Sequence, residues 1–440
     1  MSGKPLGLVF FPAFDWAISP THPEREERLL YTRDQIVEEG LLDMDTIREY
    51  KPRLALREDL ERVHVCVPNI MSLITDAHRV SAGGAITAAE AVMRGETARS
   101  FALVRPPGHH AMRVVHGTRG FCTINIEAIM IEYLRRHYGI GRVAVVDTDV
   151  HHGDGTQDIF YHDPDTLFIS FHQDGRTLYP GSGFTNEMGS PPAFGSTINL
   201  PLPPGTNDEG LHTILDELIL PVLADFQPDL IINSAGQDNH YSDPLANMAI
   251  TAQGYARLAD KLKADIAVLE GGYSIEDALP YVNVGIILAM AGMDYSKVIE
   301  PDIANSVRHQ ADSTTAYIRN LIADRRAVWN ARDSLQKEAI QKAGNLWRRQ
   351  KGIYYDDSGI QERQTESVHI CPHCRGYLTI ATEAQGGRFA CQSAFIAVSW
   401  RDSCGRCRAA ARDEVMQAKK QRQYQHYFLQ DLYQDTLEKI

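Results

Sequence analysis

Five short apolar runs, each followed within a few residues by glycine and by acidic, histidine or tyrosine residues, constrain the fold of this chain more than any other feature. The runs are rich in β-branched residues, and the segments between them have helical spacing of apolar residues. This alternation is typical of buried parallel strands joined by crossover helices. The sequence therefore predicts an α/β layered domain with a central, mainly parallel sheet. The five runs are residues 101–104, 143–146, 167–170, 230–232 and 266–269.

The residues that follow the runs predict a single site. In open parallel sheets, ligands bind outside the carboxyl ends of the strands. Five strands that all end in chemically active residues beside glycine place those residues at one edge of the sheet. Turn formation alone explains one such ending, but not five.

Asp149, His151 and Asp238 are the candidate metal ligands. Asp149 and His151 are two residues apart at the end of a predicted strand, so their side chains point to the same face. Asp238 follows another strand. Three nitrogen and oxygen ligands leave one position open, which is the arrangement of a catalytic zinc site.

His109 and His110 follow a turn of two prolines and a glycine. Amide hydrolysis needs a base for water and an acid for the leaving amine, and imidazole titrates in the right range. Asp147 and Asp154 are available to fix the histidine tautomers. Tyr273 follows two glycines and can donate a hydrogen bond to a developing oxyanion.

These motifs resemble the histone deacetylase family, in particular its class II and bacterial amidohydrolase branches. The matching residues run through almost all of residues 1–300 and occur in the right order. They are His22-Pro-Glu24, Arg62-Val-His64, Arg105-Pro-Pro-Gly-His-His-Ala111, Gly120-Phe-Cys122, residues 147–156, residues 179–183, Ser234-Ala-Gly236, Asp243-Pro-Leu245 and Glu270-Gly-Gly-Tyr273.

The resemblance implies an arginase-like fold and hydrolysis of an acyl-amine amide. It assigns the three candidate ligands to zinc, makes His110 the general base and acid, and makes His109 its electrostatic partner. Asp154 and Asp147 would orient these imidazoles, and Tyr273 would polarise the amide carbonyl.

The resemblance also implies a substrate channel and a second ion. Gly120, Phe121 and Tyr179 would line the channel that holds the alkyl chain of the acylated amine. Family members hold a potassium ion near the strand that ends in Asp147. That ion would involve Asp147, Asp149, His151 and Ser170.

Two departures from the family pattern concern substrate choice. Gln237 stands where an apolar residue is usual beside the third ligand. The segment between Val67 and Ser81 is short, and Asp76 is the only candidate there for the family's acidic residue at the channel rim.

The remaining chain predicts a helical extension and a small metal module. Residues 301–350 have apolar residues at helical spacing, which predicts one or two amphipathic helices. Residues 351–366 are polar and predict a linker. We therefore divide the chain into a catalytic domain (1–300), a helical extension with linker (301–366), and a zinc-ribbon-like module with a terminal helix over 411–440 (367–440).

The cysteines favour a metal site over disulfides. Five of the seven lie in the tail, and two Cys-x-x-Cys pairs are separated by 29 residues. Four thiolates close the coordination sphere of zinc, which is typical of a structural site. The opposing hypothesis is that these thiols never meet. The four candidate ligands are Cys371, Cys374, Cys404 and Cys407.

Charge and composition bound the partners. The net charge is −13, made up of −18 in residues 1–300 and +5 in residues 301–440. An acidic catalytic region favours cationic substrates, although solubility explains it equally well. We see no signal peptide, membrane span or nucleic-acid motif, and expect a cytoplasmic protein. The C-terminal helices are a candidate surface for homo-oligomers.

Four functions remain open at this point. The first is deacylation of lysine side chains in proteins or peptides. The second is hydrolysis of acetylated polyamines or other small amides by the same chemistry. The third is a non-catalytic scaffold that binds acyl-lysine, which the presence of Tyr273 disfavours. The fourth is a two-metal ureohydrolase, which would need additional bridging carboxylates.

Overall fold

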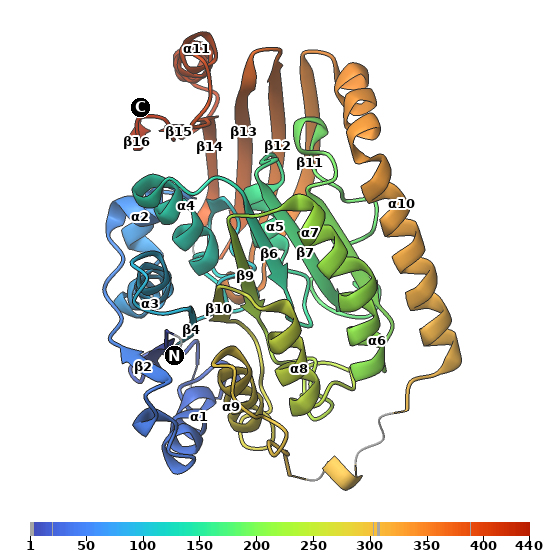
Figure 1. Ribbon diagram of the computed structural model, residues 1–440. Coiled ribbons are helices and arrows are strands. Elements are labelled where there is room, and N and C mark those ends of the chain that lie inside the picture. Colours follow the sequence, from blue (N-terminus) through green and yellow to red (C-terminus); the bar gives the residue numbers. More distant parts are fainter. Residues whose placement is uncertain (1–3, 20, 302, 306–308, 388) are drawn as a thin grey trace.

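The computed structural model describes residues 4–19, 21–301, 303–305, 309–387 and 389–440. Its centre is an eight-stranded parallel sheet with the strand order β2-β1-β4-β10-β9-β6-β7-β8 (Figure 1). The predicted α/β layered domain is therefore confirmed. The strands are β1 (Leu6–Phe11), β2 (Ile47–Tyr50), β4 (Arg99–Val104), β6 (Val143–Asp147), β7 (Thr166–Gln173), β8 (Thr197–Leu202), β9 (Leu230–Ala235) and β10 (Ile266–Leu269).

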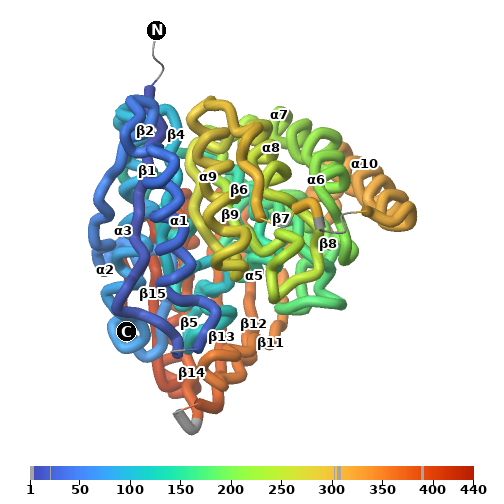
Figure 2. The backbone as a smooth tube through the Cα atoms, turned by 90° about the horizontal axis from the view of Figure 1, so that it is seen from below, coloured from blue at the N-terminus to red at the C-terminus, as the bar shows by residue number. Residues whose placement is uncertain are grey.

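Helices cover both faces of this sheet (Figure 2). Because successive strand residues point to opposite faces, Val145 packs into one apolar core while Ala144 and Val146 pack into the other. The first core holds α3 (Asp76–Met93) and α4 (Ile126–Tyr138). The second core holds α1 (Glu27–Glu38), α6 (Asp208–Ile214), α7 (Leu220–Phe226), α8 (Ala252–Leu262) and α9 (Leu279–Met290).

A single long helix follows the central domain. The apolar spacing in residues 301–350 becomes α10 (Asp312–Ala343), which packs Ile318, Leu321, Ile322 and Trp329 against the second core. Within the described residues, no helix is both long enough and apolar enough to cross a membrane.

A six-stranded sheet occupies the C-terminal part of the chain (Figure 1), and we call it the second sheet. Its strands pair antiparallel except for β14 and β15, which pair in parallel across α11 (Gly405–Gln421). They are β11 (Leu346–Tyr355), β12 (Ile360–Cys371), β13 (Cys374–Gly386), β14 (Phe389–Ser399), β15 (His426–Asp431) and β16 (Thr436–Lys439).

The linker prediction for residues 351–366 is wrong, because this segment forms half of β11, the short helical turn Asp356–Ser358 and more than half of β12. Alternate residues of β12 are buried, as a strand requires, but Glu362, Gln364 and Glu366 occupy these buried positions. Their partners are polar groups such as the Tyr355 hydroxyl. A buried face of hydrogen-bonded carboxylates and amides therefore has a polar sequence. β12 also crosses the boundary placed between residues 366 and 367.

The terminal helix expected over 411–440 ends at Gln421, and two strands follow it. The run Tyr427-Phe-Leu429 is buried on both sides, which suits a strand inside a sheet. The cysteine region is thus part of a larger sheet. Val65, Val67 and Val114 of the central domain share an apolar cluster with this sheet, so the two parts pack together.

Candidate active site

Four neighbouring strands of the central sheet, β4, β10, β9 and β6, bring the candidate residues to one edge. His109 and His110 follow β4, and Tyr273 follows β10. Asp238 follows β9, and Asp149 follows β6. The structure thus assembles these side chains where the parallel topology places a ligand.

The three candidate metal ligands are buried and close together. The donor atoms of Asp149, His151 and Asp238 all lie within 4.8 Å of one another. Nδ1 of His151 is 3.0 Å from Asp149 Oδ1 and 3.1 Å from Asp238 Oδ2. Two carboxylates and an imidazole at these distances fit a zinc ion.

Backbone groups hold the two carboxylates in place. Gly271 N–H donates to Asp149 Oδ2 at 2.7 Å, and Val150 N–H donates to Asp238 Oδ1 at 2.8 Å. Glycine makes this approach possible, because a Cβ on Gly271 would lie 2.2 Å from Asp238 Oδ2. The ligand set therefore sits in a cradle that a side chain would fill.

Each histidine of the adjacent pair has its own carboxylate. His109 Nδ1 is 3.1 Å from Asp147 Oδ2, and His110 Nδ1 is 2.8 Å from Asp154 Oδ1. Burial lowers the pKa of both rings, but for His109 the neighbouring carboxylates outweigh it and raise its pKa to about 9. For His110, burial and the charges of His109 and nearby Arg119 hold the pKa well below its usual value.

Tyr273 is buried beside the ligand set, and burial raises the pKa of its phenol well above the usual value. The phenol therefore stays protonated and can donate a hydrogen bond. Its backbone is fixed because Tyr273 N–H donates to Asp243 Oδ2 at 2.7 Å. The guanidinium of Arg28 lies 4.9 Å from the centre of its ring and donates to the carbonyl of Gly272.

Glu270 positions the histidine turn, which the sequence did not reveal. Its Oε2 accepts the N–H groups of Gly108 at 2.8 Å and His109 at 3.1 Å. Burial and the neighbouring carboxyl of Glu127 raise the pKa of Glu270 well above its usual value. The motif residues Glu24 and Arg105 likewise form a buried ion pair of 2.7 Å, which ties the segment just before α1 to the residue that follows β4.

A cavity of about 250 Å³ opens onto these groups. Gly120, Phe121 and Tyr179 line it, as the sequence predicted for the channel, together with His109, His110, His151 and Tyr273. A larger open groove of about 320 Å³ lies on the second sheet. Among the described residues that line it there is no histidine, and none belongs to a cluster of potential metal ligands.

Asp76 does not line this cavity. Its side chain is 80% exposed at the start of α3 and pairs with Arg79 at 3.0 Å. The acidic residue at the cavity is instead Asp356, from the second sheet. Sequence reasoning also missed Arg119, whose guanidinium donates to Asp154 Oδ2 at 2.5 Å and so braces the partner of His110.

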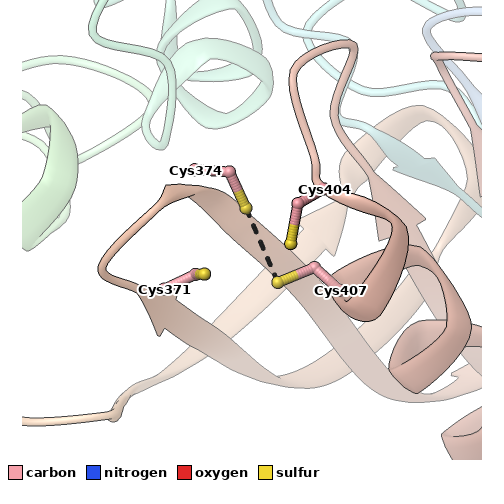
Figure 3. Close-up of side chains that lie close together, drawn as sticks. All are labelled: Cys371, Cys374, Cys404 and Cys407. Carbon is pink, nitrogen blue, oxygen red and sulfur yellow. Dashed lines mark hydrogen bonds between the residues drawn. The ribbon is translucent and has the colours of Figure 1, made fainter.

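A second group of potential metal ligands lies in the second sheet (Figure 3). Cys371 and Cys374 come from the turn between β12 and β13, while Cys404 and Cys407 come from the start of α11. Their four sulfurs lie within 4.8 Å of one another, with Cys374 and Cys407 at 3.6 Å. The two pairs therefore meet, and four thiolates fit a closed zinc site.

Comparison with known proteins agrees with this geometry. The histone deacetylase domain pattern matches residues 68–286. A probable deacetylase of Archaeoglobus fulgidus is 44% identical over 352 residues, which span 73% of this chain and 97% of that protein. The chain belongs to the histone deacetylase family.

Two other relatives and a solved structure also match. The acetoin utilization protein AcuC of Bacillus subtilis is 32% identical over 67% of this chain and 84% of its own length. An acetylpolyamine amidohydrolase of Burkholderia pseudomallei is 41% identical over 44% of this chain and 57% of its own length. The solved HDA15 HD domain superposes with a TM-score of 0.65 at 25% identity, covering 77% of this chain and 99% of that domain.

As a member of this family, the protein is an enzyme that acts on acyl amides. The family is zinc-dependent, and the Asp-His-Asp group and the four-cysteine group are both arranged to bind metal.

Proposed function

We propose that this enzyme hydrolyses the amide of acylated lysine side chains, with zinc held by Asp149, His151 and Asp238. One observation carries the proposal. His151 of the metal-ligand group, the histidine pair and Tyr273 all line one cavity. The aromatic side chains of Phe121 and Tyr179 line the same cavity and suit an alkyl stem. When bound, zinc supplies a Lewis acid for the acyl carbonyl and favours deprotonation of water.

The side chains of this chain account for the proton transfers. Tyr273 donates a hydrogen bond to the acyl oxygen, which gains negative charge as water attacks. His110, held by Asp154, takes the proton from the water at Nε2 and delivers it to the leaving amine. His109, held by Asp147, acts as the electrostatic partner of His110 during this transfer. Phe121 and Tyr179 exclude water from the stem of the acylated amine.

Acylated polyamines are the second candidate substrate. Their acylated end has the same amide and a similar alkyl stem, and the catalytic groups described above do not distinguish the two. The observation that favours them is the acidic side chain of Asp356 at the cavity.

Two further ions belong to the proposal. The four cysteines would hold a structural zinc, since they leave no open position for substrate. Potassium would bind near the end of β6, close to Asp147, Asp149, His151 and Ser170. The C-terminal helices remain our candidate surface for homo-oligomers. We expect the protein to act in the cytoplasm.

The test is hydrolysis by the zinc-loaded protein. An acetyl-lysine peptide and an acetylated diamine should be compared by kcat/KM, before and after chelation and after adding zinc back. We expect activity that chelation abolishes and zinc restores, and Asp149→Ala should lack it. Full activity of a metal-free preparation, or no hydrolysis of either substrate by the zinc-loaded protein, would contradict the proposal.

A further inference from the structure

One wall of the active-site cavity comes from the second sheet. Asp356 lies in the short helical turn Asp356–Ser358, between β11 and β12, and lines the cavity with Phe121 and Tyr179. This turn is 236 residues away in sequence from Gly120, to which it is hydrogen-bonded. The histone deacetylase domain pattern ends at residue 286, so the turn lies outside it.

The turn is firmly attached to the central domain. The Tyr355 hydroxyl donates to the carbonyl of Val114 at 2.9 Å, and Thr118 N–H donates to Ser358 Oγ at 2.9 Å. Arg119 Nε donates to the carbonyl of Tyr354 at 3.0 Å. Contacts on both sides of Asp356 therefore fix where its carboxylate lies.

The channel wall next to this turn has an unusual backbone. Gly120 and Phe121 both have positive φ, of 51° and 68°. Their N–H groups donate to the carboxylates of Asp356 at 3.0 Å and Asp357 at 2.9 Å. Since a left-handed phenylalanine is strained, these bonds help to hold the channel residue Phe121 in place.

The Asp356 carboxylate has capacity left for a ligand. Oδ1 accepts both Gly120 N–H and, at 3.2 Å, the hydroxyl of Tyr179. Among the described residues, no hydrogen bond ends on Oδ2 and no lysine or arginine forms an ion pair with Asp356. The neighbouring Arg119 is already paired with Asp154. A half-buried negative charge without a cation therefore borders the cavity.

We propose that Asp356 is a specificity-determining residue, which binds a positively charged ammonium of the substrate at the mouth of the channel. This inference rests on the proposed function and names its substrate class, acylated amines with a second cationic nitrogen beyond the alkyl stem. A carboxylate in a partly desolvated wall attracts an ammonium more strongly than a neutral amide N–H. A polyamine carries this ammonium itself, whereas a peptide supplies it only through a neighbouring basic residue.

The test uses pairs of substrates that differ only in this charge. An N-acetylated diamine is compared with the N-acetylated alkylamine of equal chain length, and an acetyl-lysine peptide with a flanking arginine is compared with one flanked by glutamine. The wild-type enzyme should prefer the charged member of each pair. Asp356→Asn keeps a carbonyl oxygen for Gly120 and Tyr179 but removes the charge. It should lower kcat/KM roughly tenfold more for the charged member than for the neutral member of each pair.

Two further variants make the result decisive. Asp356→Glu keeps the charge and should retain the preference. Asp333→Asn makes the same charge change on α10, where the side chain is 83% exposed, and should change neither member. An equal loss on both members, or no loss, would overturn the inference, because Asp356 would then only support the channel wall. If the wild-type enzyme hydrolyses none of the four compounds, the proposed function itself fails.

Discussion

The glycine cradle beneath the ligand set gives the sharpest test of the metal site, because it changes no ligand. In Gly271→Ala, the added Cβ would lie 2.2 Å from Asp238 Oδ2 and 2.6 Å from Asp149 Oδ2. Both carboxylates are fully buried and fixed by backbone N–H groups, so they have little room to withdraw. The methyl group therefore acts as a wedge between two of the three ligands.

The expected loss follows from the displacement. A carbon and an oxygen in contact need more than 3 Å, so Asp238 Oδ2 must move by about 1 Å. Zinc sites tolerate deviations of only about 0.2 Å in ligand distance. Disturbing even the supports of a ligand lowers affinity roughly tenfold to a hundredfold, and a displaced ligand should cost at least as much.

The assay is zinc affinity by competition with a chelator, measured beside kcat/KM at saturating zinc. The matched control is Gly352→Ala, since a Cβ there meets nothing closer than 4.0 Å and its backbone is not left-handed. Unchanged zinc affinity and kcat/KM in Gly271→Ala would refute the reasoning, because the two carboxylates could not then be ligands of one ion in this arrangement.

Three further predictions concern the oxyanion donor, the cysteines and acid stability. Tyr273→Phe should lower kcat roughly a hundredfold with little change in KM, and a variant with full kcat would exclude a donor role. The Cys371→Ser/Cys374→Ser double variant should lose one of two zinc ions per chain while keeping hydrolysis, whereas one zinc in the wild type would contradict a second site. Burial lowers the pKa of His64 to about 3 and of His78 to about 4, whereas the pKa of both is 6.5 in the unfolded chain. Each buried neutral ring therefore contributes stability that is fully present above pH 6.5 and is lost as the pH falls. Lowering the pH from 7.5 to 5.5 should reduce the free energy of unfolding by about 1.4 kcal/mol for each of the two histidines. Equal stability at the two pH values in chemical unfolding would refute this.

Much of the active site could be predicted because its residues obey local rules. Asp149 and His151 are two residues apart at a strand end, and the parallel topology brings the end of β9, with Asp238, beside them. The four cysteines carry their spacing in the sequence and do converge. These predictions need only the spacing of residues within short segments and the rule that parallel strands end on the same side of a sheet. The amino-acid sequence alone is therefore sufficient for them.

Asp356 and Arg119 could not be predicted, because their positions depend on how the second sheet packs. The segment around Asp356 is polar and resembles a linker, since the buried face of β12 carries glutamate and glutamine. Hydrophobic periodicity does not register a buried face that is made of hydrogen-bonded polar side chains. Because the pattern of residues 351–366 predicts a linker, the sequence also provides no indication that Asp356 lines the cavity.

The cavity residue Asp356 and the cysteine cluster lie at opposite ends of β12. Asp356 lies just before its start and Cys371 at its end, and 12 residues of strand span about 40 Å. This is several Debye lengths, so charge at the cysteines has no direct influence on the channel. A metal there can affect substrate choice only by keeping the sheet folded. The bonds of Tyr355 and Ser358 to the central domain hold the other end independently. Loss of the cysteine-bound metal should therefore leave the preference for charged substrates intact as long as the sheet stays folded, and should abolish it together with the sheet.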